Sequence, residues 1–423
     1  MPQAPTYTFH LPSLHDNTRL DCRLYHPPSL KLPHPLNDQE NKRLKGAVIA
    51  HPYAPFGGSY DDPVVLFTAE TLLEEGFVVA TFNFRGAGGS QNHTSWTGKP
   101  ETDDFASVAG FLVFYLQYLL PEKSTPTPSL NSNSNTQEES PQTHSSNPGT
   151  DNETSSTPAT PLTPRKLRML LAGYSYGTLV LARLPALQTV LERFQHAAAG
   201  TAAREMLFRA GILAAQTLET TRNLRRESGR ESLRPADDTV AAAATPSFES
   251  EFDIGIDGKA EIDNDDDDCP STAAAAAAAT TTAAAAADDP HTPANNPLPP
   301  LSTTYLLISP VLFPFPFPAT LLPPGPPFAR TNLNLNLHNL TTTSAGQMPT
   351  FLHHTTLAIF GSGDGFTARK RLRTWAARME ARSEGEGAFE WREVEGSGHF
   401  WREEGVMGEL VRGVRGWVRR GGD

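Results

Sequence analysis

The feature that most constrains the fold of this chain is a glycine–serine turn between an apolar run and a helical one. Residues 167–172 form the apolar run, residues 173–177 read Gly-Tyr-Ser-Tyr-Gly, and helix-favouring residues begin at Thr178. A buried strand that passes through Gly-x-Ser-x-Gly into a helix is typical of a nucleophile elbow, whose tightness requires small residues on both sides of the serine. The turn lifts the hydroxyl of Ser175 clear of the sheet and aims the backbone N–H of Tyr176 at the same point.

Short apolar runs alternate with helical patterns along the rest of the chain. Continuous apolar runs of this length are typical of strands that are covered on both faces. They lie at residues 47–50, 77–82, 305–309 and 357–360, with a last strand at 389–394 and an antiparallel pair at 6–12 and 18–26. Helical patterns occupy residues 63–76, 103–120, 178–224 with a break near Pro185, and 406–418. Strands that alternate with helices form βαβ units, so we predict an α/β fold with a mostly parallel sheet flanked by helices.

Two long stretches lack the apolar residues that a core needs. Residues 123–164 are almost entirely Ser, Thr, Pro, Asn, Gln and Glu, whereas residues 226–300 combine an acidic run with alanine and threonine tracts. Ordering each residue costs roughly 1–2 kcal/mol of backbone entropy, which burial cannot offset here. We therefore predict that both stretches are disordered insertions in a single domain that spans residues 1–423. About 300 residues remain, which is enough for one core.

The charge, the cysteine content and the lengths of the apolar runs indicate which partners, disulfides and membrane segments to expect. The net charge is −12, with the acidic residues concentrated in the second predicted insertion. The arginine-rich C-terminal stretch is interleaved with glutamates, a pattern typical of solvated helix faces rather than of a nucleic-acid surface. Two cysteines, Cys22 and Cys269, do not indicate a disulfide framework. No apolar run reaches about 18 residues and no leader pattern is present, so we expect a cytoplasmic protein with no transmembrane segment.

The base that a serine nucleophile needs is predicted at His399. A serine hydroxyl is a poor nucleophile at neutral pH unless a histidine, itself held by a carboxylate, lies within hydrogen-bond reach. In folds with this elbow the acid and then the base follow the serine along the chain. His399 is the last histidine, in Gly-Ser-Gly-His-Phe directly after the final predicted strand. The alternative, a structural or merely exposed histidine, is disfavoured by that position.

The acid is predicted by elimination. Between Asp289 and Gly363 there is no Asp or Glu, so the loop after the strand at 305–309 offers no carboxylate. Asp364 is the first carboxylate available, directly after the strand that ends at Phe360. Glu380 lies on the following helix and is the second choice. The alternative interpretation of Asp364 is a turn residue in a glycine-rich loop.

Two further parts of the site are expected from loops that follow strands. The second oxyanion donor should come from the loop after residues 47–50, where Pro52 and Pro55 have no N–H to give. We select Tyr53 to act with Tyr176, although the loop can also be an ordinary proline turn. A proline-rich loop on the same side of the sheet carries four phenylalanines that are either a substrate pocket or a cover for the sheet edge. They are Phe313, Phe315 and Phe317, which we select for the pocket, and Phe328.

Several of these stretches together resemble the α/β-hydrolase superfamily, and within it the intracellular branch of dienelactone-hydrolase-like and Xaa-Pro dipeptidyl-peptidase-like proteins. They are His51-Pro52 with Gly57-Gly58, Asp61-Asp62-Pro63-Val64-Val65, Asn83-Phe84-Arg85-Gly86-Ala87-Gly88, residues 173–177 and 361–364, and Gly398-His399-Phe400. The resemblance implies a serine hydrolase with Ser175, Asp364 and His399 as its triad and with no metal or organic cofactor. Dienelactone hydrolases proper use cysteine, so their substrate is not carried over. The loop after Asp364 lacks the acidic residue and proline often found there.

The expected function is hydrolysis of a small-molecule carboxylic ester or thioester through an acyl-enzyme on Ser175. A peptide substrate is less expected because no additional domain that would select peptide ends is evident in the sequence. The alternative from another class is a catalytically silent hydrolase fold that serves in binding or as a scaffold, with the two insertions as interaction tails. The sequence identifies neither the substrate nor the oligomeric state.

Overall fold

The computed structural model describes residues 3–31, 43–95, 98–120, 166–231, 300–312, 350–383 and 389–421. The first predicted insertion, residues 123–164, lies outside these ranges, and so do residues 232–299 of the second.

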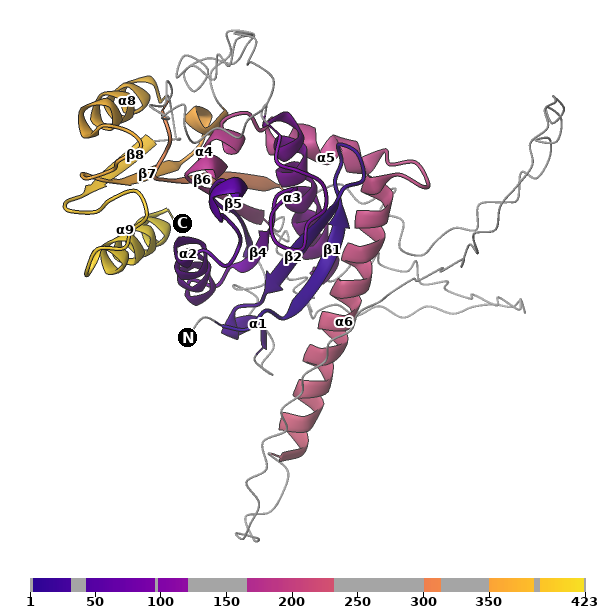
Figure 1. Cartoon of the computed structure of the whole chain (residues 1–423). Helices are drawn as coiled ribbons and strands as arrows, with labels where there is room; N and C mark the ends of the chain where they lie inside the picture. The colour runs from indigo at the N-terminus through magenta and orange to yellow at the C-terminus, as the bar shows by residue number, and fades with distance from the viewer. Residues whose placement is uncertain are drawn as a thin grey trace, which may run out of the picture. The chain divides into compact units, whose positions relative to one another are not determined.

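Eight strands of the described residues form one sheet (Figure 1). They are β1 (Tyr7–Pro12), β2 (Arg19–Tyr25), β3 (Arg43–Ala50), β4 (Val78–Phe82), β5 (Lys166–Tyr174), β6 (Leu301–Ile308), β7 (Thr356–Gly361) and β8 (Phe389–Val394). Their order across the sheet is β1-β2-β4-β3-β5-β6-β7-β8. The pairs β1–β2 and β2–β4 are antiparallel, and all other neighbours are parallel. The predicted mostly parallel sheet is confirmed.

Helices cover both faces of this sheet. One face is covered by α2 (Pro63–Glu74) and α9 (Val406–Arg420), which lie side by side in Figure 1. The other face is covered by α3 (Lys99–Leu119), α4 (Tyr176–Leu181), α5 (Leu187–Gln195), the first half of α6 (Ala202–Glu231) and α8 (Arg369–Arg382). The short elements are α1 (Pro28–Lys31) and the 3₁₀ turns η1 (Ala54–Phe56) and η3 (Thr350–His353).

The central strands carry continuous apolar runs because successive side chains enter different cores. In β3, Val48 and Ala50 pack in the core beneath α3, whereas Ala47 and Ile49 pack in the core beneath α2 and α9. The period of two along a strand makes this alternation unavoidable, so a strand covered on both faces places its side chains in the two cores in turn. All four residues are at most 1% exposed.

The helix boundaries follow the expected local chemistry with one correction. Asp62 caps α2, with its Oδ1 accepting the backbone N–H of Val64 at 2.8 Å, and Pro63 is the first helical residue. The long helical pattern is broken at Pro185 as predicted, between α4 and α5. However, α6 continues to Glu231, past the predicted end at residue 224. The first residues of the second predicted insertion are therefore helical.

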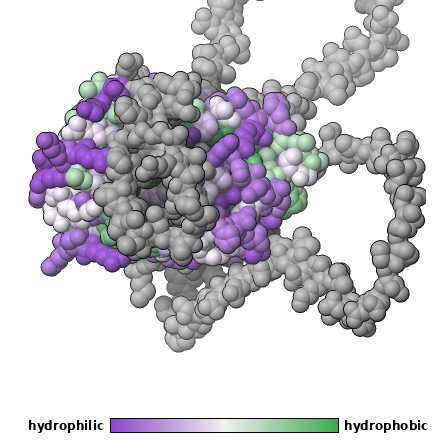
Figure 2. All heavy atoms as spheres, turned by 45° about the horizontal axis from the view of Figure 1, so that its top comes forward, coloured by the Kyte–Doolittle hydropathy of each residue, from purple (hydrophilic) through white to green (hydrophobic). Residues whose placement is uncertain are grey.

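Three further observations concern the surface, the helices and Cys22. The face turned forward in Figure 2 carries mostly hydrophilic residues where the structure describes it, with scattered apolar ones. Among the helices of the described ranges, none has the length and apolarity needed to cross a membrane. Cys22 is buried and free, and burial raises the pKa of its thiol well above the usual value.

Candidate active site

Ser175 lies in a strained turn between β5 and α4. Its φ is 54° and its ψ is −111°, outside the regions that residues with a Cβ ordinarily adopt. A Cβ at Gly173 would lie 2.5 Å from the backbone carbon of Gly177, and one at Gly177 would lie 2.9 Å from Ala50. The turn therefore closes only because both flanking residues are glycine. The Ser175 N–H donates to the carbonyl of Ile308 at the end of β6, 2.9 Å away, which fixes the turn to the neighbouring strand.

The structure brings His399 to Ser175. The distance between Ser175 Oγ and His399 Nε2 is 2.8 Å, although 224 residues separate the two along the chain. Both residues are nearly buried, with Ser175 7% and His399 3% exposed. His399 lies in the loop between β8 and α9, as the sequence predicts. A histidine in this position can accept the proton of the serine hydroxyl through Nε2.

Asp364 bonds the other nitrogen of the imidazole, so the three side chains form one row of hydrogen bonds. Its Oδ2 lies 2.7 Å from His399 Nδ1, and its Oδ1 accepts the backbone N–H groups of Phe366 at 2.8 Å and Thr367 at 2.9 Å. The carboxylate therefore holds the ring with Nδ1 as donor and leaves Nε2 for the serine. Glu380, the second choice, accepts the indole N–H of Trp391 at 3.0 Å instead.

The loop that carries His399 crosses the ends of β7 and β6 to reach β5. A Cβ at Gly361, the last residue of β7, would lie 2.0 Å from the carbonyl oxygen of Ser397, so only glycine permits the crossing. The His399 carbonyl then accepts the Tyr174 hydroxyl at 3.0 Å and the Ser309 hydroxyl at 3.4 Å. The position of the imidazole is thus set by side chains at the ends of two strands. The sequence alone did not assign these roles to Tyr174 and Ser309.

The two predicted oxyanion donors lie next to each other. Tyr53 directly precedes η1 in the loop after β3, and the centroids of the Tyr53 and Tyr176 rings are 5.1 Å apart. Tyr176 is the first residue of α4, so its backbone N–H has no partner within the helix. The backbone of the loop is fixed by the Gly58 N–H, which donates to the Tyr53 carbonyl at 3.2 Å.

His51 supports this loop through hydrogen bonds at both nitrogens of its ring. It is fully buried; its Nδ1 donates to the Pro52 carbonyl at 2.5 Å, and its Nε2 accepts the Phe84 N–H at 2.9 Å. Burial lowers the pKa of His51 to about 4, against a smaller raising effect of the bond to Pro52. The ring is therefore neutral at physiological pH, and it connects the loop after β3 with the loop after β4.

Two aromatic residues beside the imidazole are absent from the sequence prediction. The ring of Phe366 lies 4.2 Å from that of His399, and the ring of Phe400 meets the same imidazole edge-on at 5.4 Å. Phe400 directly follows His399 and Phe366 lies two residues after Asp364, and this proximity in the chain is the signal that could have revealed them. The phenylalanines that the sequence did propose for a pocket, Phe313, Phe315 and Phe317, lie outside the described residues.

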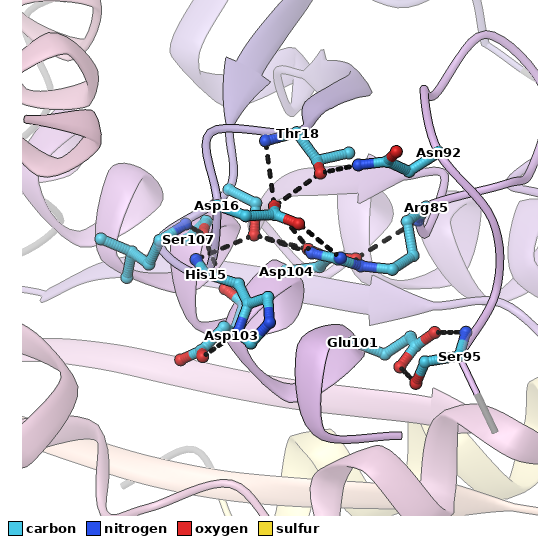
Figure 3. A network of polar contacts seen from close by, with 12 residues as sticks. His15, Asp16, Thr18, Arg85, Asn92, Ser95, Glu101, Asp103, Asp104 and Ser107 are labelled. Carbon is cyan, nitrogen blue, oxygen red and sulfur yellow. Dashed lines mark hydrogen bonds and ion pairs between the residues drawn. The ribbon is translucent and has the colours of Figure 1, made fainter. Parts of the chain in front are cut away.

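A second polar cluster surrounds Arg85, in the loop after β4 (Figure 3). Arg85 donates through Nε and Nη2 to the two carboxylate oxygens of Asp104 at 2.9 and 2.7 Å, and through Nη1 to Asp16 at 3.0 Å. Arg85 is 4% exposed and Asp104 is fully buried. Burial raises the pKa of Asp16, but hydrogen bonds from Arg85 and Thr18 outweigh it and lower that pKa to about 2. The Asp16 carboxylate is therefore ionised at neutral pH while it bonds the Arg85 guanidinium.

A metal site is not evident in the part of the chain that the structure describes. Nowhere in those ranges do three or more His, Cys, Asp or Glu side chains gather as a metal ion would require.

Comparisons with known proteins gave matches only among solved structures. No family model matches the chain, and no curated protein matches it. The chain is similar to a Xanthomonas campestris protein described as an a/b serine hydrolase without lid, at 15% identity and a TM-score of 0.41, covering 99% of this chain and 97% of that one.

Two other solved structures are similar to a comparable degree. An alpha-beta serine hydrolase homologue from Coxiella burnetii matches at 12% identity and a TM-score of 0.40, covering 99% of both chains. Est1E from Butyrivibrio proteoclasticus, with ferulic acid bound, matches at 9% identity and a TM-score of 0.42, covering 97% of this chain and 98% of that one. The function proposed below is carried by the geometry of the site and not by these similarities.

Proposed function

We propose that the protein is a serine hydrolase that cleaves a carboxylic ester or thioester through an acyl-enzyme on Ser175. The observation that carries the proposal is the continuous row of hydrogen bonds from Ser175 Oγ to His399 Nε2, at 2.8 Å, and from His399 Nδ1 to Asp364 Oδ2, at 2.7 Å. The strained backbone at Ser175 supports it, because strain of this kind persists where a reactive group must be presented.

The first half of the reaction forms the acyl-enzyme. Ser175 Oγ attacks the acyl carbonyl while His399 Nε2 takes the hydroxyl proton, and the carbonyl oxygen becomes an oxyanion. Asp364 orients the imidazole and stabilises the imidazolium without taking the proton itself. When the tetrahedral intermediate collapses, the bond to the alcohol or thiol breaks and the imidazolium gives its proton to that leaving group. Ser175 is then acylated and His399 is neutral.

The second half of the reaction releases the acid. A water molecule attacks the acyl carbonyl while His399 takes one of its protons, and the proton passes to Ser175 Oγ as the acyl bond breaks. The backbone N–H groups of Tyr53 and Tyr176 are the proposed donors to the oxyanion in both halves. Removing one such donor costs about 10²–10³ in turnover in enzymes of this kind.

Esters and thioesters are proposed in preference to peptides. The described residues form one sheet with its flanking helices, and they include no second sheet that would select the ends of a peptide. Alcohols and thiols are also better leaving groups than amines, so an ester or thioester bond is cleaved more readily than an amide bond.

A fluorophosphonate probe tests the proposal directly. We expect covalent labelling of the folded protein, loss of labelling in Ser175→Ala, and unchanged labelling in Ser383→Ala, a serine at the end of α8 that bonds only the local backbone. A folded wild-type protein that is not labelled would instead support the silent binding or scaffold alternative. A series of p-nitrophenyl esters of graded acyl length then defines the acyl group.

A further inference from the structure

The rings of Phe366 and Phe400 form a corner beside the catalytic imidazole proposed above. Phe366 lies nearly flat against His399, with the centroids 4.2 Å apart and the planes inclined by 31°. Phe400 stands almost perpendicular to both rings, at 88° to His399 and 85° to Phe366, with both centroid distances 5.4 Å. The two phenylalanines therefore offer a face and an edge that meet next to the triad.

Both rings are fixed by the same loops that carry the triad. The Phe366 N–H donates to Asp364 Oδ1 at 2.8 Å, and Phe400 follows His399 directly in the chain. Phe366 is half-buried, but Phe400 is 47% exposed even though its ring is large and apolar. The Arg402 guanidinium lies 5.3 Å from the Phe400 ring centroid. The Phe400 ring therefore remains partly exposed directly beside the imidazole.

The chemistry of the proposed reaction says which part of a substrate reaches this corner. The imidazole must give its proton to the leaving oxygen or sulfur, so that atom lies within hydrogen-bond distance of His399 Nε2. The substituent on the leaving atom then extends along groups that border the imidazole. The acyl group, in contrast, is fixed to Ser175 and to the oxyanion donors near Tyr53 and Tyr176.

We propose that Phe366 and Phe400 form the binding site for the leaving alcohol or thiol, and that they select a flat aromatic group at that position. Aromatic pairs favour offset-stacked and edge-to-face arrangements, and a ring in this corner makes contacts of that kind with both phenylalanines. The inference rests on the proposed hydrolase function and adds the chemical class of the leaving group. Phe366 and Phe400 are specificity-determining residues in this account.

The test uses acetates that differ only in the alcohol, so the acyl group is constant. Benzyl, cyclohexylmethyl and ethyl acetate are compared by kcat/KM in the full-length wild type and in Phe366→Leu, Phe366→Ala and Phe400→Ala. Phe67→Ala is the matched control, because Phe67 is 44% exposed on α2. We expect the benzyl-to-ethyl ratio to fall about threefold to tenfold in each alanine variant and to stay unchanged in the control.

Phe366→Leu keeps the apolar volume but removes the ring. It is expected to abolish the preference for benzyl over cyclohexylmethyl acetate while keeping the preference for either over ethyl acetate. Equal losses on all three esters would mean that the rings only position the imidazole, and unchanged ratios would mean that the leaving group lies elsewhere; either result overturns the inference. Both leave fluorophosphonate labelling intact, whereas a wild type without labelling would overturn the hydrolase proposal and this inference together.

Discussion

Two buried groups of polar side chains at the carboxyl edge of the sheet are built in opposite ways. Around Arg85 the contacts branch, since one guanidinium bonds both oxygens of Asp104 and also reaches Asp16. Around Ser175 the contacts form a single row in which each side chain bonds the next one. In the branched cluster each charged group is held by several partners, whereas the row ends in a hydroxyl that has one side-chain partner.

The backbone repeats this contrast. Ser175 is held at a φ of 54° and a ψ of −111°, and such strain costs on the order of 1–3 kcal/mol. The loop between β4 and α3 carries Arg85 and also contains residues with positive φ. Most of these are glycines, which adopt that conformation without strain. We therefore expect the Arg85 cluster to stabilise the fold, and the strained turn at Ser175 to lower stability because it holds the hydroxyl in a fixed position.

The largest expected effect comes from removing the hydroxyl. Ser175→Ala should lower ester turnover by about a millionfold without lowering the melting temperature, because the hydroxyl has one side-chain partner and sits on strained backbone. Ser175→Gly should raise the melting temperature, since glycine tolerates this conformation. Turnover and thermal unfolding are measured on the same preparations. A loss of only a few-fold in turnover would reject the mechanism.

A substitution in the Arg85 cluster should lower the free energy of unfolding. Arg85→Met leaves the buried carboxylate of Asp104 without its cation, and the free energy of unfolding should fall by about 3–5 kcal/mol. Arg412→Met, which removes an exposed pair with Glu409, is the control and should change stability little. Chemical denaturation gives both values. If Arg85→Met unfolds no more easily than the control, the branched cluster is not a source of stability.

His51 is a buried histidine at the same edge of the sheet, and the pH dependence of stability tests its contribution to the fold. Its pKa is about 4 in the folded protein and 6.5 in the unfolded chain, so the unfolded state binds more protons between these values. Its contribution to stability is fully present above pH 6.5 and is lost as the pH falls. Between pH 7.5 and pH 5 we expect a loss of about 2 kcal/mol that disappears in His51→Gln. An unchanged pH dependence in the variant would assign the effect to other groups.

The smallest effect is expected at the opposite end of the sheet. Residues 123–164 join α3 to the start of β5, whereas Ser175 follows the end of β5. Because the two ends of a strand are far apart, deletion of this segment with a short linker should leave melting temperature and turnover nearly unchanged. A collapse of either would show that the segment is part of the folded domain.

The proposed site could be predicted where a candidate residue lies in the loop after a recognisable strand. Ser175, Asp364 and His399 come after β5, β7 and β8, and the order of these strands in the chain supplied the order of their roles. Phe366 and Phe400 could not be assigned from the same signals. Their rings reach the imidazole through the conformations of two loops, which residue spacing does not determine.

The Arg85 cluster and the end of α6 were missed for a different reason. Asp16, Arg85 and Asp104 lie far apart in the sequence, and only the packing of the first hairpin and α3 against the loop after β4 brings them together. In α6, the apolar pattern fades after residue 224, but arginine and glutamate continue the helix to Glu231 because they favour it intrinsically. Loss of an apolar face therefore marks the end of packing and not the end of a helix.

The crossing of the histidine loop over β7 and β6 also sets a minimum on its length. Three steps between neighbouring strands separate β8 from β5, a span of about 14 Å. The five residues from the end of β8 at Val394 to His399 reach at most about 17 Å when fully extended. The loop nonetheless turns between Val394 and Ser397, where the Ser397 N–H donates to the Val394 carbonyl at 3.4 Å. The imidazole and the serine side chain must therefore supply part of the reach, and backbone and side chains set the minimum length together.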